Sequence, residues 1–324
     1  MLKTLSVKEF KKNIILNIAK ITIITIFSVV VFANFVPYYE ATHDSYVYAL
    51  KAKSLLEGSW EISNKELTER GEWEFVPNSW KKTVHDTAIP KYPPGISAIG
   101  SISYLVAGNA GLFLLGPFLS IVFLIISDRV ATNLFGKEVG LLTILFLAAN
   151  GIIFVGSVHL LSDSIFATLV VLGFFCIIKF MKGKNHKYLF FASLILSISS
   201  FFRLGGILYL PIEIGVVGAF LLYSEVKKRK STKENNIESK SNINFYKLAI
   251  AISIPWLLFI VFFASFNNHY FGDPLTTFYN VPGDPWVKPG TGSYLSIFNG
   301  DPENFEIIKG YSILFYHTLY TKLK

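Results

Sequence analysis

Five ionisable side chains lie close to the ends of long apolar runs: Asp44, Lys91, Asp163, Arg203 and Asp273. Carboxylates can accept a proton from a reacting group, and lysine or arginine can bind an anionic group. Ionisable residues near a membrane are costly and usually functional, so such a group marks a candidate site. The topology that the sequence predicts places all five at the outer face of a membrane. We therefore expect a site at that face.

The composition is that of a membrane protein. The chain has 324 residues, of which 52% are hydrophobic and 16% charged, with a mean hydropathy of +0.48. A soluble domain carries about a quarter charged residues. The net charge is +8, but the basic residues cluster beside the apolar runs, as the positive-inside rule describes. This distribution favours membrane lipids as partners and argues against nucleic acid.

Apolar runs of span length recur along the chain and predict an all-α integral membrane protein, built as a multi-span helical bundle. We expect about seven spans. They cover residues 14–36, 111–126, 139–158, 164–181, 188–202, 205–223 and 248–266. The basic residues 1–13 precede a run that is too long for a cleaved signal peptide. We therefore expect a cytoplasmic N-terminus and an uncleaved signal anchor.

A polar stretch after the first span predicts a large outer loop over residues 37–110. Loops of such length without a function are uncommon. Within it, residues 44–56 have the pattern of a helix that lies at the membrane interface and that Gly58 ends. Tyr48 lies on the apolar face of this helix, and Lys51 lies on the opposite face.

The apolar run 94–107 at the end of this loop has about fourteen residues, short of the ~20 that a span requires. If it crossed the membrane, the basic stretches 182–187 and 227–230 would both lie outside, against the positive-inside rule. We therefore expect a second interfacial helix on the outer surface.

Two further segments complete the predicted organisation. Residues 14–266 form the transmembrane domain, which a charged cytoplasmic linker rich in Asn, Ser and Lys interrupts at 224–247. Residues 267–324 form a tail at the outer face, with turn signals of the Gly-Asp-Pro kind.

Several short elements follow one another in an order that resembles a known family. They are His-Asp at 43–44, Lys-Tyr-Pro-Pro-Gly at 91–95, Leu-Phe-Gly-Lys at 134–137, Leu-Ser-Asp-Ser at 161–164, Phe-Arg-Leu-Gly-Gly at 202–206 and Phe-Gly-Asp-Pro at 271–274. This order resembles the GT-C superfamily of polyprenyl-phosphate-sugar-dependent glycosyltransferases, in its protein O-mannosyltransferase-like and lipid A aminoarabinose transferase-like branch. The resemblance covers most of the chain. It rests on the order of the elements and on Lys-x-Pro-Pro, since no single motif is specific.

The resemblance implies an enzyme of the plasma membrane, active at the outer face. It would move a sugar, such as a mannose-like hexose, from a polyprenyl- or dolichyl-phosphate donor to a hydroxyl of a protein, lipid or glycan, with inversion. Such a transfer needs a base for the hydroxyl proton and cations for the phosphate oxygens. By the resemblance, Asp44 is the base. Asp163 could orient the acceptor or the sugar, or complete a metal site with His43 and Asp44. Each of these positions also suits a helix N-cap, which is the alternative for both.

Lys91 and Arg203 are the predicted ligands of the donor phosphate. Lys91 precedes two prolines that fix the backbone before the interfacial helix, and Arg203 precedes Gly205 and Gly206, which would let a phosphate approach closely. The alternative for Lys91 is a lysine that reaches from the interface to water, and for Arg203 it is a span-end anchor on ordinary lipid phosphate.

Four more side chains are candidate accessory groups: His43, Tyr46, Tyr92 and His159. The tyrosines, together with Tyr48, could stack on a sugar, although interfacial tyrosines are common in any membrane protein. His159 stands four residues before Asp163, which would put both on one face of a helix. The simpler interpretation of His159 is an incidental histidine. Ligands for a metal cannot be placed from the sequence, so no metal or other cofactor is predicted.

Two other classes of protein remain as alternatives. A transporter or lipid flippase usually needs ionisable residues inside its spans, and Glu213 is the mid-span residue that we expect to stand out in this respect. A shortened, non-catalytic relative that serves as a partner subunit is the third interpretation.

Overall fold

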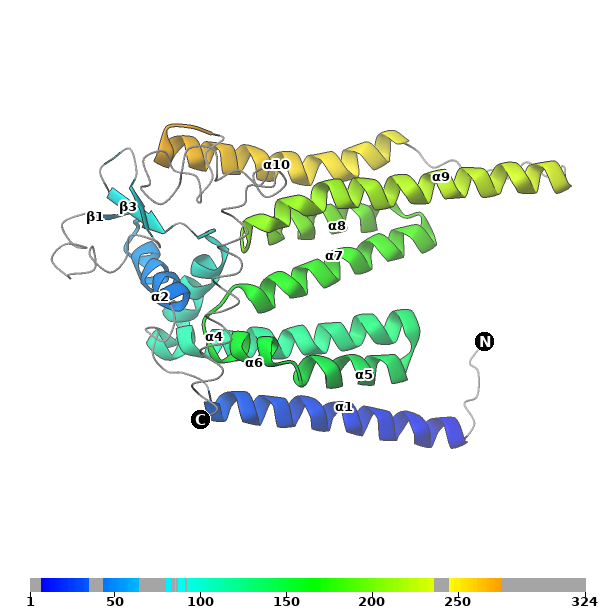
Figure 1. The fold of residues 1–324 in the computed structure, drawn as a ribbon, viewed down its shortest axis with the longest axis horizontal. Helices are drawn as coiled ribbons and strands as arrows, with labels where there is room; N and C mark the ends of the chain where they lie inside the picture. Colours follow the sequence, from blue (N-terminus) through cyan, green and yellow to red (C-terminus); the bar gives the residue numbers. More distant parts are fainter. Residues whose placement is uncertain are drawn as a thin grey trace, which may run out of the picture.

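The computed structural model describes residues 7–34, 43–63, 80–82, 85, 87–90, 92–235 and 245–274. Long helices run side by side in a bundle, with a short helix and a small sheet at one end (Figure 1). The helical elements are α1 (Val7–Asn34), α2 (His43–Leu56), α4 (Gly95–Phe135), α5 (Lys137–Ala148), α6 (Gly151–Val158), α7 (Asp163–Gly183), α8 (His186–Ser199), η2 (Leu204–Leu208), α9 (Tyr209–Asn235) and α10 (Phe245–Phe271).

The helical multi-pass membrane architecture is confirmed. Within the described residues, five helical segments are long and apolar enough to cross a membrane, and the pair α5 and α6 would make a sixth span. The predicted count of seven is not confirmed. The remaining predicted span, 188–202, corresponds to α8, which has 14 residues. Such a helix is about 21 Å long, whereas the hydrocarbon core is about 30 Å thick.

Helix α4 folds back on itself at the point where the sequence predicts a change from interfacial helix to span. The backbone is non-helical at Ala107 (φ −138°, ψ 18°) and Gly108 (φ 59°, ψ −144°). Across the bend, Ser103 Oγ donates a hydrogen bond of 2.8 Å to the carbonyl of Gly111, although residues eight apart in a straight helix are separated by about 12 Å. The first arm, residues 95–106, is about 18 Å long and therefore too short to cross a bilayer.

The predicted span 139–158 is also bent. Helices α5 and α6 meet at an angle of 66°. The side-chain oxygen of Asn150 accepts hydrogen bonds from the backbone N–H groups of Ile152 (2.9 Å) and Ile153 (3.2 Å). Asparagine is a favoured N-cap, so a new helix begins here in a new direction.

Two predicted segments contain continuations of the helices before them. Helix α9 continues to Asn235, well into the stretch 224–247 that was predicted to be a linker, because lysine and glutamate are good helix formers. Helix α10 extends to Phe271, into the predicted outer tail 267–324. The rest of that tail, from residue 275 on, lies outside the described residues, as do residues 1–6 of the predicted N-terminal segment.

The predicted outer loop contains a small antiparallel sheet that the sequence did not indicate. Its strands are β1 (Ile62–Ser63), β2 (Trp80–Lys82) and β3 (Thr87–Pro90), in the order β1-β3-β2. Ile89 of β3 is buried together with Tyr270 of α10. The sheet thus ties the outer loop to the end of α10.

The two ends of the bundle differ in charge and in content. Helix α2, the sheet and the first arm of α4 lie at one end, which we call the α2 end (Figure 1). The turns that join α4 to α5 and α7 to α8 lie at the opposite end, which we call the basic end. These turns carry Lys137, Lys182, Lys184 and Lys187.

Candidate active site

A cavity of about 340 Å³ opens at the α2 end of the bundle. Four segments that are distant in the chain line it: the start of α2, the turn before α4, the turn before α7 and the segment that joins α8 to α9. Among the lining residues are three of the predicted site residues, Asp44, Tyr92 and Arg203. Its size is that of a pocket for a small ligand.

Asp44 lies in the first turn of α2, where it is half-buried. The hydroxyl of Tyr92 donates a hydrogen bond of 2.6 Å to Asp44 Oδ1, and the rings of Tyr48 and Tyr92 lie 5.4 Å apart. Because α2 begins at His43, Asp44 is inside the helix and does not occupy the capping position that was its alternative role. Asp44 lines the cavity. There its carboxylate accepts the hydrogen bond of Tyr92, which lies 48 residues further along the chain.

Asp163 and Arg203 form an ion pair at the edge of this cavity. Arg203 Nη2 lies 2.9 Å from Asp163 Oδ1, and the two side chains are 52% and 43% exposed. The N-cap of α7 is Ser162, so Asp163 is not the cap that its alternative role requires. The pair leaves much of the guanidinium open to solvent and to an incoming group.

Close backbone packing brings Arg203 to this place. The N–H of Gly95 donates a hydrogen bond of 2.7 Å to the carbonyl of Phe201, and a Cβ on Gly95 would lie 2.6 Å from that oxygen. This contact joins the start of α4 to the end of α8. Of the two glycines after Arg203, Gly205 lines the cavity with open space beside it, whereas Gly206 packs tightly against Ser200.

Of the other predicted residues, those that the structure describes do not line the cavity. Tyr46 is half-buried elsewhere on α2, and Asp273 lies exposed after α10. Lys91 and the side chain of His43 lie outside the described residues.

The predicted pairing of His159 with Asp163 on one helical face is wrong. His159 follows the last residue of α6, and Asp163 begins α7, so no continuous helix joins them. The His159 ring is partly buried, and this burial lowers its pKa. The chain turns at this point because the carbonyl of His159 packs against Gly116 of α4, where a Cβ would come within 2.2 Å of it.

Lys51, on the face of α2 opposite Tyr48, is buried and not open to solvent. Lys51 is only 3% exposed, because the segment around Trp60, strand β3 and the end of α10 cover that face of the helix. Tyr48 and Ala52 are buried on the other face, as predicted. A helical pattern shows which residues share a face, but not that a distant segment covers the polar one.

Glu213, the mid-span residue that would favour a transporter, is closed off inside the bundle. It is fully buried and accepts hydrogen bonds from Ser193 Oγ (2.7 Å) and Trp256 Nε1 (3.0 Å). These bonds join α8, α9 and α10. The expectation that Glu213 stands alone is wrong, because Lys20 of α1 is buried as well and lies 2.5 Å from Asp128 of α4. Both clusters are satisfied by their own partners and hold helices together.

Within the described residues, no group of three or more His, Cys, Asp or Glu side chains is placed to hold a metal ion. No family model, curated protein or solved structure matches the chain. The residues that line the cavity are therefore the structural basis for the proposed function.

Proposed function

We propose that the chain is a membrane glycosyltransferase of the GT-C type, which takes its sugar from a polyprenyl-phosphate donor. The observation that supports this best is the shared cavity. Asp44 and Arg203, which the resemblance makes the base and a phosphate ligand, line one space at the α2 end of the bundle. A base and a cation that line one cavity beside the membrane suit a reaction between a hydroxyl and a lipid phosphate ester.

In the proposed reaction the acceptor hydroxyl attacks the anomeric carbon of the sugar. A bond forms between the acceptor oxygen and that carbon, and the bond from the carbon to the phosphate oxygen breaks. The hydroxyl proton passes to the Asp44 carboxylate, and the lipid phosphate leaves with the bonding electrons. One displacement inverts the configuration. Tyr92 holds the Asp44 carboxylate in position through its 2.6 Å hydrogen bond.

Arg203 would bind the donor phosphate. Its ion pair with Asp163 is half-exposed, and such pairs contribute only about 0.2–1 kcal/mol. A phosphate diester can therefore share or take over the guanidinium, whose planar fork suits two phosphate oxygens. Lys91, directly before Tyr92 in the chain, would be a second phosphate ligand.

The same proposal fixes the orientation in the membrane. Lysines at the α4–α5 and α7–α8 turns support a cytoplasmic location for the basic end, and we propose that the α2 end and its cavity face outward. We propose seven spans in the plasma membrane, with α8 as a short span and the α5–α6 pair as a bent one. The acceptor, a hydroxyl of a protein, lipid or glycan, would approach from the aqueous side over Asp44.

The test is transfer of labelled sugar by membranes that carry the protein, with mannosyl, glucosyl and aminoarabinosyl polyprenyl phosphates as donors. Asp44→Asn should reduce transfer by about 10²–10⁴-fold, because the amide cannot accept the hydroxyl proton. Asp273→Asn is the matched control, since Asp273 is an acid at the same end that does not line the cavity. Undiminished transfer by Asp44→Asn would remove the assignment of the base. Absence of transfer from all three donors by the wild type would count against the function itself.

A further inference from the structure

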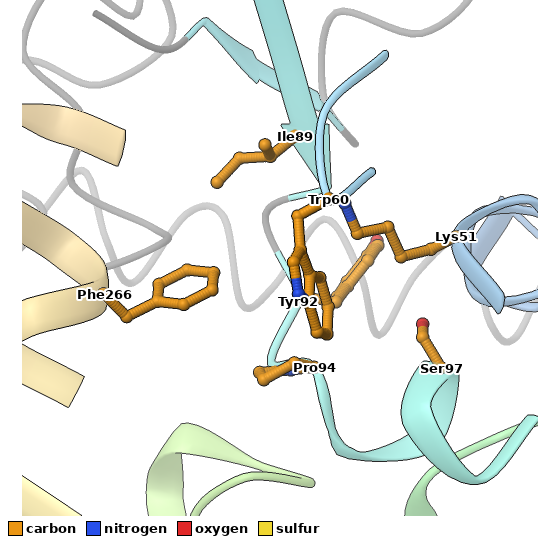
Figure 2. A pocket seen from close by; sticks show the side chains of 7 residues that line it. All are labelled: Lys51, Trp60, Ile89, Tyr92, Pro94, Ser97 and Phe266. Atoms are coloured by element: carbon orange, nitrogen blue, oxygen red, sulfur yellow. The ribbon is translucent and has the colours of Figure 1, made fainter. Parts of the chain in front are cut away.

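Lys51 is a buried basic residue that the proposed transfer does not use. Its side chain reaches from α2 to Trp60, and Nζ lies 4.7 Å from the centre of the indole ring (Figure 2). Within the described residues Nζ has no hydrogen-bond partner. A buried donor without an acceptor is costly, and more so if it is charged, and a cation–π contact offsets only part of that cost. Among the described residues, the amine therefore lacks an acceptor.

A small pocket adjoins this amine. Trp60, Tyr92, Ser97 and Phe266 line it together with Lys51 (Figure 2). Its free volume is about 10 Å³, which is room for one water-sized group. Apolar rings enclose the space and the polar groups of Lys51 and Ser97 face it, so a single oxygen atom that accepts hydrogen bonds would suit it.

The pocket is next to the cavity of the candidate active site. Tyr92 lines both spaces, and its hydroxyl is the group that donates to Asp44. The next residues of the chain continue the shared wall, with Pro93 on the cavity and Pro94 on the pocket. A movement of the Tyr92 ring would open one space to the other.

Burial and a neighbouring carboxylate act in opposite directions on the pKa of the Lys51 amine. Burial is the larger effect and lowers its pKa, the Glu61 carboxylate opposes it, and the resulting pKa is about 7. Glu61 in turn lies 4.0 Å from Nε2 of His85. An amine with this pKa is a mixture of charged and neutral forms at neutral pH, and a bound anion would draw it to the charged form.

We infer that Lys51 and Ser97 form a second oxyanion subsite, which takes one oxygen of a phosphate or carboxylate group of the substrate bound beyond Tyr92. An ammonium and a hydroxyl are donors for such an oxygen, and the surrounding rings exclude the water that would compete. This inference rests on the proposed function, because the substrate is the one that occupies the Asp44–Arg203 cavity. The oxyanion belongs either to the lipid phosphate or to an acidic substituent of the sugar.

The test measures how fast the Lys51 amine of the full-length protein in detergent micelles is reductively methylated by formaldehyde and cyanoborohydride at pH 7.5. Mass spectrometry gives the extent of modification at Lys51 and, as an internal control, at Lys53. Four additives are compared: inorganic phosphate, short-chain polyprenyl phosphomannose, the corresponding glucuronate, and the uncharged polyprenol. We expect at least one of the anions to slow modification of Lys51 fivefold or more, with Lys53 and the polyprenol sample unchanged.

The pattern of protection identifies the source of the oxyanion. Protection by phosphomannose indicates the lipid phosphate, and protection by the glucuronate alone indicates a sugar carboxylate. Equal rates at Lys51 with and without all three anions would overturn the subsite, as would no reaction at all, since a pocket that admits an oxyanion also admits formaldehyde. Protection without sugar transfer would retain the subsite and reject the enzyme. If sugar transfer occurs and Lys51→Gln changes the donor KM no more than Lys53→Gln does, the enzyme is retained and the subsite is rejected.

Discussion

The carboxylate of Asp44 is held where two distant segments meet. Tyr92 donates to it at 2.6 Å, and Tyr92 is itself fixed by its contact with the Tyr48 ring. A carboxylate that already accepts one hydrogen bond keeps a lone pair for an incoming hydroxyl, which a general base requires. At the cavity edge, the half-exposed ion pair with Asp163 orients the Arg203 guanidinium without burying it.

Lys51 gives a pH-dependent prediction at the level of one residue. Its burial lowers the amine pKa to about 7, so the reactive neutral form should accumulate as pH rises from 6 to 8 and then reach a plateau. Methylation of Lys51 measured from pH 6 to 10 should therefore show a midpoint near pH 7. A rate that continues to climb above pH 9, as for an ordinary lysine, would contradict the buried environment.

The predicted span ends and the family resemblance pointed to three of the residues that line the cavity, but not to their contacts. Hydropathy placed Asp44, Tyr92 and Arg203 near span ends on one side, which is a local property of the chain. It could not show that Tyr92 bonds to Asp44 or that Asp163 pairs with Arg203, since tertiary packing decides such pairs. The burial of Lys51 could not be predicted for the same reason, because the segments that cover it lie elsewhere in the chain.

At the level of elements, the close contact of Gly95 with Phe201 positions the site. It fixes the start of α4, directly after Tyr92, against the segment that leads into Arg203. A side chain at Gly95 would lie 2.6 Å from the Phe201 carbonyl and 2.9 Å from the Phe202 ring. Both groups are part of the packed core, so neither can give way cheaply.

Gly95→Ala should therefore destabilise the protein by about 1–3 kcal/mol, as overpacking does, and should lower sugar transfer by separating Tyr92 from Arg203. Gly215→Ala is the matched control, because Gly215 of α9 has open space beside it. Thermal unfolding in detergent compares the two variants. Equal midpoints for Gly95→Ala and the wild type would show that the contact does not hold the two segments.

The apolar runs showed which segments form helices, but they showed less well where the helices bend and end. The apolar runs gave the long helices because burial in lipid depends on composition over ~20 residues. The short run 94–107 gave the first arm of α4, because its length alone rules out a span. The 66° bend before α6 had a local signal in Asn150 followed by Gly151, but a capping residue does not reveal the angle. The extension of α9 was missed because a charged stretch resembles a linker in composition and yet has high helix propensity.

At the scale of the whole molecule, the two ends of the bundle carry different groups. The candidate site, α2 and the sheet lie at one end, and the lysine-bearing turns lie at the other (Figure 1). In the described part of the bundle, the buried Glu213 and Lys20 lie in closed clusters with their own partners. This division is what a catalyst at the outer surface needs, since its lipid substrate lies in the membrane and its acceptor in water.

The most direct test is the membrane sidedness of three positions. In a Cys176→Ser background, cysteine is introduced singly by Asp44→Cys, Arg203→Cys and Lys187→Cys, and intact cells are treated with a membrane-impermeant maleimide before and after permeabilisation. We expect the positions of Asp44 and Arg203 to be labelled in intact cells, and that of Lys187 only after permeabilisation. Labelling of Asp44 and Arg203 from opposite sides of the membrane would contradict the shared site and the proposed catalysis with it.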